Sequence, residues 1–224
     1  MTRRLLHVFC GAAFLALLCG AMMPQQSLSQ DKGIEIGGTY SYMWAGTYHL
    51  YYGEIQMEDG NQWGGFVSFS LRPDTKLELS YLNSQSNAKY YAYSYIPQEH
   101  PELADVNSPV TIQYFQLGSV YQIDKGKASP FFGAYLGAAY FNPTGTPPKG
   151  VTYEGQWNFA VSFAGGVKLY VSEKFGLRLQ GRLLLPMYFS GGSMYVGTGG
   201  AGVAVGAGIP VVQGDVGVGV FLRL

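Results

Sequence analysis

Cysteine, charge and long apolar runs are all scarce in this chain. The two cysteines, Cys10 and Cys19, both lie in the N-terminal segment, so the rest of the chain contains no disulfide. A protein exported without disulfides needs a large core or a closed, hydrogen-bonded barrel in lipid. Charged residues make up 12% of the chain, against about 25% in an ordinary globular domain. After the N-terminal segment, no apolar run approaches the ~20 residues of a transmembrane helix.

The N-terminus predicts export. Arg3 and Arg4 form a positively charged start, and an apolar segment, Leu5–Met23, follows and leads into a short polar stretch with small residues. This pattern is typical of a cleaved secretory signal. We therefore assign residues 1–29 to a signal peptide and residues 30–224 to one mature domain. A membrane anchor is the alternative, but a histidine interrupts the segment and leaves it shorter than the ~20 residues of a comfortable span.

The charge balance argues against a nucleic-acid partner. Lys and Arg total 14 and Asp and Glu total 14, so loss of Arg3 and Arg4 leaves two more acidic than basic residues. A polyanion would require the opposite balance. Glycine and tyrosine are abundant instead, with 32 and 18 residues. Low charge and many aromatic residues, without a spanning helix, favour an outer-membrane β-barrel.

The stretch Phe175–Met187 shows the clearest pattern. Its apolar side chains fall on one parity, whereas Arg178, Gln180 and Arg182 fall on the other. Successive side chains of a strand point to opposite faces, so this stretch predicts a strand with one apolar and one polar face. One such strand does not identify its solvent, because a soluble sheet shows the same alternation.

Eight segments are predicted to be strands, each near the ~9–11 residues that a tilted strand needs to cross a bilayer. They are Ile34–Trp44, Gln62–Leu71, Lys76–Asn83, Val110–Ile123, Phe131–Phe141, Gln156–Val171, Phe175–Met187 and Asp215–Leu224. Short connections alternate with long ones (45–61, 84–109, 142–155 and 189–214), as in barrels with tight periplasmic turns and long extracellular loops. The predicted fold is all-β: an eight-stranded antiparallel up-and-down transmembrane β-barrel after a cleaved signal peptide.

Aromatic residues cluster at the ends of these strands, which suits two girdles at the membrane interfaces. The expected loop-side girdle contains Tyr40, Tyr42, Trp44, Trp63, Tyr140, Phe141, Trp157 and Phe159. The expected turn-side girdle contains Tyr121, Phe131, Tyr170, Phe175 and Phe221.

Three segments carry a resemblance to a known family. They are Pro130–Gly137, the hairpin from Gly165 to Arg182, and the ending Gln213–Leu224. With them the chain resembles the OmpA-type outer-membrane β-barrel domain family, the small eight-stranded barrels. The resemblance implies the fold, the outer membrane and insertion by the barrel-assembly machinery, but no single activity. Members of this family usually end in an aromatic residue that the machinery reads, whereas this chain ends in Leu224.

The polar parity places eight charged residues in the lumen. An eight-stranded barrel has an interior that side chains can fill, and buried charges must pair or be hydrated. We therefore expect an ion-pair network that plugs the lumen, with a narrow pathway for small solutes as the alternative. The eight residues are Glu35, Lys76, Glu78, Lys168, Arg178, Arg182, Asp215 and Arg223.

The sequence gives no basis for an enzyme, a metal site or a cofactor. Beyond the signal, the only histidines are His49 and His100, both in predicted loops. Carboxylates accompany each of them, but no regular element fixes their geometry for catalysis or metal binding. The glycine-rich stretch 196–208 lacks the lysine of a phosphate loop and predicts a flexible or β-extended fourth loop.

Four tyrosines in the second predicted loop are candidates for contact with a partner: Tyr90, Tyr91, Tyr93 and Tyr95. Exposed tyrosines offer rigid contact area with a polar tip, although these could instead simply extend a hairpin above the membrane. We expect a monomeric outer-membrane protein in contact with lipid and lipopolysaccharide, with a structural or adhesion role through its loops. The alternatives are a narrow pore for small or hydrophobic solutes and a soluble secreted barrel that binds a ligand inside.

Overall fold

The computed structural model describes residues 33–49, 53–92, 106–123, 126–146, 154–187, 189–197, 200–207 and 212–224. The expected signal peptide lies outside these residues. All regular elements of the described residues are β-strands. No helix among them is long and apolar enough to cross a membrane.

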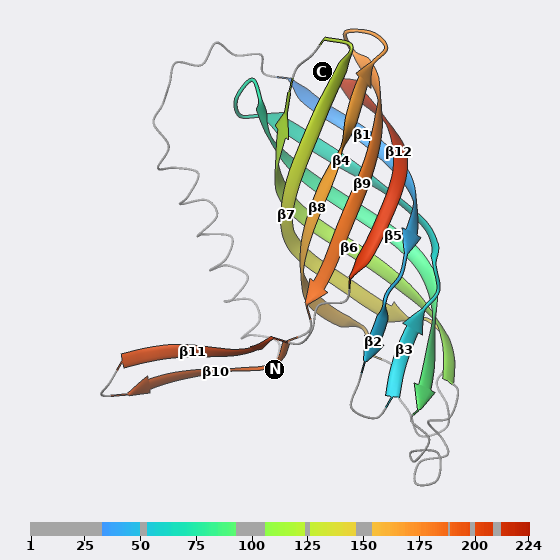
Figure 1. Ribbon diagram of the computed structural model, residues 1–224, viewed down its shortest axis with the longest axis vertical. Coiled ribbons are helices and arrows are strands. Elements are labelled where there is room, and N and C mark those ends of the chain that lie inside the picture. Colours follow the sequence, from blue (N-terminus) through green and yellow to red (C-terminus); the bar gives the residue numbers. More distant parts are fainter. Residues whose placement is uncertain are drawn as a thin grey trace. The chain divides into compact units, whose positions relative to one another are not determined.

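Eight of the strands close into one antiparallel barrel, which confirms the predicted fold (Figure 1). Around the ring they are β1 (Ile34–Trp44), β4 (Gly60–Ser70), β5 (Thr75–Ala92), β6 (Val106–Gln122), β7 (Ala128–Pro143), β8 (Gln156–Tyr170), β9 (Phe175–Met187) and β12 (Gln213–Arg223). The first and last strands pair along their length, from Glu35 with Arg223 to Trp44 with Gly214. A closed ring leaves no unpaired strand edge, which is the condition for crossing a bilayer with strands.

Alternation decides which face of each strand is inside. On β9 the exposed side chains Leu177 and Leu179 flank Arg178, which is fully buried in the barrel. On β12 the outward valines Val216 and Val218 are about half exposed, and Asp215 is buried. The outer wall is therefore apolar and the inner wall carries the charges. A soluble ligand-binding barrel has the opposite arrangement, so this alternative is wrong.

The short connections and the described chain ends lie together at one end of the barrel, here called the turn end. Tight turns join β4 to β5 and β8 to β9, where Leu71 and Val171 donate backbone hydrogen bonds to Thr75 and Phe175 at 3.0 Å. At the same end Leu224 donates to the carbonyl of Ile34 at 2.8 Å. The opposite end carries the long connections and is here called the loop end.

Two of the long connections contain more strand than the sequence predicted. The first includes β2 (Thr47–His49) and β3 (Gly53–Met57), which pair with each other and extend the sheet beside β5. In the second, β5 and β6 stay paired as far as Tyr90 opposite Val106 (Figure 1). The prediction ended these strands too early because apolar residues no longer alternate with polar ones beyond the part of each strand that would cross the bilayer. Backbone pairing needs no such parity once both faces of the hairpin can be polar.

The fourth long connection contains a separate antiparallel hairpin. It consists of β10 (Phe189–Gly197) and β11 (Gly200–Ala207), paired from Phe189 opposite Ala207 to Gly197 opposite Gly200. The sequence predicted either a flexible or a β-extended loop here, and the hairpin corresponds to the β-extended form.

The outer wall has an aromatic girdle near the loop end. Trp63 and Tyr81 pack edge to face with ring centroids 5.8 Å apart, and Phe115 lies 5.1 Å from Tyr81 and 5.9 Å from Trp157. The predicted turn-side girdle is wrong at Phe131 and Phe221, which are buried in the barrel. It is also wrong at Tyr170, whose hydroxyl bonds to the buried Glu35, and the loop-side Phe141 packs against the interior apolar cluster. The position of an aromatic residue at a strand end therefore does not show whether its side chain points outward or inward, whereas alternation along the strand does.

Candidate functional site: the barrel interior

The structure brings seven of the eight predicted charged residues together inside the barrel. Each of these residues is at most 5% exposed: Glu35, Lys76, Glu78, Lys168, Arg178, Arg182 and Asp215. The eighth, Arg223, is half-buried at the turn end beside Gly33. Alternation explains this placement, because each of these residues occupies an inward position on its strand, between two positions that face outward.

The layer nearest the turn end is centred on Glu35. Lys76 of β5 and Lys168 of β8 each form an ion pair with one of its two carboxylate oxygens. The hydroxyl of Tyr170 donates to Glu35 Oε1 at 3.3 Å, and Gln122 donates to the oxygen of Tyr170 at 2.9 Å. One carboxylate from β1 thus connects strands from both sides of the ring.

The next layer is a bidentate pair between Glu78 and Arg178. Arg178 Nη1 and Nη2 donate to the two carboxylate oxygens at 2.8 and 3.0 Å. Ser68 and Tyr135 also donate to Glu78, each at 2.7 Å. Fork-shaped pairing with a charge-assisted bond to every oxygen is the strongest arrangement available to a buried carboxylate. This layer ties together β4, β5, β7 and β9.

Three inward aromatic residues surround the cations. The guanidinium carbon of Arg178 lies 4.3 Å from the ring centroid of Phe66 and 4.4 Å from that of Phe131. The ammonium of Lys168 lies 5.4 Å from the centroid of Phe221. Ring faces stabilise cations electrostatically, and more strongly where water is excluded. The prediction did not identify these residues as partners of the cations. Parity placed Phe221 inward, and Phe66 shares the inward parity of Ser68, but Phe131 lies where small residues hide the alternation.

Inward glycines make the space for these rings. A Cβ on Gly37 would meet the ring of Phe66, and a Cβ on Gly118 would meet the ring of Tyr135. Both aromatic side chains therefore lie flat against a neighbouring strand. In this position the hydroxyl of Tyr135 reaches Glu78. The glycines act as positioning residues through close approach, not through an unusual backbone conformation.

A third polar layer is less complete. Asp215 of β12 lies directly opposite Arg182 of β9 in the strand register. Yet both carboxylate oxygens of Asp215 are buried and accept no hydrogen bond from the described residues, and Arg182 Nε donates none. Arg182 contacts Ser80 at 3.4 Å. Three layers of charge therefore differ in how well their hydrogen bonds are satisfied.

Above the charges, toward the loop end, the interior contains an apolar cluster beside a few buried polar side chains. Side chains from β1, β5, β6 and β9 pack in a cluster in which Met43, Leu82, Ile112 and Leu184 are at most 2% exposed. Tyr114 crosses this layer and donates to Gln213 at 2.5 Å. The predicted network of charged residues therefore does not account for this half of the interior. The signal was present, since Leu82 and Leu184 share the parity of the charged residues on their strands.

The remaining candidates are only partly described. Tyr90 and Tyr91 belong to strand β5, where they pair with Ile55 and Glu54 of β3, so they are not loop residues. Tyr93, Tyr95 and His100 lie outside the described residues. His49 pairs with Glu54 in the β2–β3 hairpin. The described parts of the chain contain no group of three metal-ligating side chains.

Comparison with known proteins agrees on the fold. The structure is similar to that of the outer-membrane protein AlkL in lipid bilayers, with a TM-score of 0.52 and 14% identity over 90% of this chain and 95% of that one. It is also similar to the outer-membrane protein OprG from Pseudomonas aeruginosa, with a TM-score of 0.53 and 10% identity over 86% and 96%. The match with Neisserial surface protein A has a TM-score of 0.49 and 14% identity, and it covers 86% of this chain and 96% of that one. No protein-family profile and no curated protein sequence matches the chain.

The ring of eight strands, apolar outside and charged inside, defines a small outer-membrane-type β-barrel. Its fold is similar to that of two outer-membrane proteins, AlkL and OprG, and this agrees with the fold that the resemblance to the OmpA-type family implied.

Proposed function

We propose that this protein is a non-catalytic, monomeric outer-membrane barrel with a sealed lumen, and that it acts through its loop end. The observation that carries this proposal is the pair of Glu78 and Arg178. Their strands, β5 and β9, are fourth neighbours in either direction around the ring of eight, so the pair spans the interior. A pore would need an open path at this level.

Two further contacts cross between opposite strands. Arg182 of β9 reaches Ser80 of β5, and Tyr114 of β6 reaches Gln213 of β12. The apolar layer around Leu184 adds a barrier of a different kind, since an ion that entered it would lose its hydration. Charged layers and an apolar layer in series support a sealed lumen.

The loop end offers the surface for interaction. There the β5–β6 hairpin continues beyond the aromatic girdle, and β3 and β2 widen it into a four-stranded ledge. Tyr91, 41% exposed, lies on this ledge. Rigid strands that present tyrosine suit an extracellular ligand, a glycan or lipopolysaccharide. We propose adhesion or a structural role in the envelope through this surface.

Conductance tests the sealed lumen. Refolded protein in a planar bilayer should give no current steps in concentrated KCl, whereas a known porin in the same bilayer should. Steps that recur with the wild type and change size in Arg178→Ala would overturn the proposal. Fractionation tests the location: the protein should partition with outer membranes and migrate differently on a gel before and after heating. Recovery without detergent would contradict it.

A pathway for small hydrophobic solutes is the second candidate, and the apolar layer in the outer half of the barrel favours it. Vesicles containing the protein should then take up a small apolar dye faster than empty vesicles. A charge in this layer, Leu184→Arg, should remove the difference. Equal uptake by protein-containing and empty vesicles would eliminate this candidate.

A further inference from the structure

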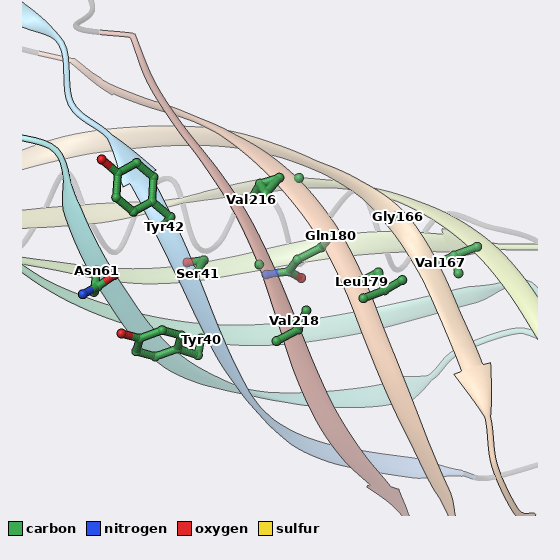
Figure 2. A pocket seen from close by; sticks show the side chains of 12 residues that line it. Tyr40, Ser41, Tyr42, Asn61, Gly166, Val167, Leu179, Gln180, Val216 and Val218 are labelled. Atoms are coloured by element: carbon green, nitrogen blue, oxygen red, sulfur yellow. The ribbon is translucent and has the colours of Figure 1, made fainter.

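A groove of about 710 Å³ crosses the outer wall of the barrel over β4, β1, β12, β9 and β8. Ligand pockets commonly have volumes of about 300–1,000 Å³, so this one has room for a lipid chain. Figure 2 shows the side chains that line it, with tyrosines and an asparagine at one end and aliphatic residues at the other.

The strand register explains the groove. Its floor is a row of four residues paired across neighbouring strands, Ser41, Gly217, Gln180 and Gly166. On β1, β9 and β12 these positions point inward, so the groove meets mainly their backbone. Outward side chains of the two adjacent rows form the sides.

One side of the groove is interrupted. The row runs from Asn61 through Tyr42 and Val216 to Gly181. At Gly181 the wall has no side chain, although there is room for one, since a Cβ there would come no closer than 3.7 Å to the backbone oxygen of Asp215. The absence of a side chain is therefore not imposed by packing within the barrel.

The other side is a complete row, Tyr40, Val218, Leu179 and Val167. The phenol rings of Tyr40 and Tyr42, 56% and 46% exposed, stand at the same end as the amide of Asn61 (Figure 2). This end belongs to β1 and β4, and Asn61 is the second residue of β4, at the loop end of the barrel. Leu179 and Val167 lie at the opposite, wholly apolar end.

We propose that this groove binds one acyl chain of an outer-leaflet lipopolysaccharide, with the polar atoms near the head of that chain at Tyr40, Tyr42 and Asn61. The inference rests on the proposed position in the outer membrane. The groove is continuous with the apolar wall that contacts hydrocarbon, so acyl chains are the molecules that reach it. Tyrosine hydroxyls at the interface with apolar ring bodies below suit the junction of head and chain.

The aromatic girdle supports the same occupant. At the loop ends of β4, β5, β6 and β8 the outward positions hold Trp63, Tyr81, Phe115 and Trp157. At the corresponding part of β9 and β12 the outward side chains are aliphatic or absent, as at Leu183 and Gly214. A lipid chain can therefore lie flat against this sector of the wall.

Native mass spectrometry of the refolded full chain, titrated with purified lipid A, tests the inference. Gly181→Leu should fill the groove and lower the fraction of lipid-bound protein at least five-fold. Gly38→Leu is the matched control, because Gly38 also faces outward with room for a Cβ, 3.7 Å from the oxygen of Gly64, but lies outside the groove. It should bind lipid A like the wild type. Tyr40→Phe with Tyr42→Phe should weaken binding without filling the groove.

Equal binding by Gly181→Leu and Gly38→Leu would overturn the inference. So would a dimer of the wild type that Gly181→Leu abolishes, because the groove would then hold a second copy of the chain. Heat-modified gel mobility verifies that each variant is folded. Conductance of the wild type separates the two proposals. If the wild type conducts no current and Gly181→Leu binds lipid A as well as the wild type does, the lipid groove is rejected while the sealed lumen is retained.

Discussion

Arg178 holds both carboxylate oxygens of Glu78 from the far side of the barrel, at 2.8 and 3.0 Å. The two residues are 100 positions apart in the chain and lie on strands that face each other across the interior. Such a pair fixes the distance between the two walls. The barrel is therefore held together by its backbone ladder around the ring and by this contact through its middle.

Removal of one partner should destabilise the barrel strongly. Arg178→Met leaves the carboxylate of Glu78 buried without its cation, which costs about 3–5 kcal/mol in comparable buried pairs. The double variant with Glu78→Gln should recover part of this loss, because it removes the stranded charge as well. The free energy of unfolding, measured by urea titration in lipid vesicles, would show this.

Lys174→Met, in an exposed turn, is a control for loss of one positive charge and should change little. If Arg178→Met lowers the free energy of unfolding no more than this control does, the pair of Glu78 and Arg178 does not stabilise the barrel.

Asp215 should behave differently from Glu78, although both are buried carboxylates. No hydrogen bond from the described residues reaches either oxygen of Asp215, whereas Glu78 accepts four. A buried charge without hydrogen bonds is costly, so Asp215→Asn should leave stability unchanged or raise it. Glu78→Gln should lower it by about 3 kcal/mol or more. Equal losses in the same unfolding assay would show that Asp215 is as well satisfied as Glu78.

Parity explains how much of the fold could be predicted. Clean alternation on Phe175–Met187 gave the strand bounds and the inward direction of Arg178 directly. Prediction failed where alternation stopped carrying information, as in the polar extension of β5 from Ser84 to Ala92. There the strand continues through backbone pairing with β6, which leaves no apolar alternation in the sequence.

The candidate site could be predicted as a set of residues but not as a set of contacts. Inward parity placed Glu35, Lys76 and Lys168 in one lumen. Their pairing depends on the stagger of strands around the ring, and nothing local in the sequence records it. The position of Phe131 beside Arg178 was also hidden in the sequence, because its small neighbours Gly133 and Ala134 obscure the alternation that would show its direction.

Gly118 should be essential for the network although it makes no polar contact itself. A side chain there would collide with the ring of Tyr135 and with the backbone oxygen of Ala134. Gly118→Val should displace the ring, remove the bond to Glu78 and destabilise the barrel by about 1–3 kcal/mol, as overpacking usually does. Gly165→Val is a suitable control, because a Cβ at this outward glycine would come no closer than 3.9 Å to other atoms. Equal stability of the two variants would show that the ring has another place to go.

The ion pair of Glu58 and Lys89, on the ledge at the loop end, should be visible in titration. Lys89 Nζ lies 2.6 Å from Glu58, and Asn87 donates to the same carboxylate at 2.9 Å. The hydrogen bond from Lys89, then that from Asn87, lowers the pKa of Glu58 below its usual 4.5, and the same contact raises the pKa of Lys89. Because the folded pKa of Glu58 lies below the unfolded one, its contribution is present above the unfolded pKa. It is lost as the pH falls through the folded value.

Carbon-13 NMR of the Glu58 carboxyl group should therefore show a pKa below 4.5 that moves back toward this value in Lys89→Met. Both side chains are 42% exposed, so added salt should weaken the shift in the wild type. Lys127→Met, a charge removed at the turn end, should leave the titration of Glu58 unchanged. An unshifted pKa in the wild type at low salt would mean that the pair does not persist, and that the ledge presents a free carboxylate to its partner.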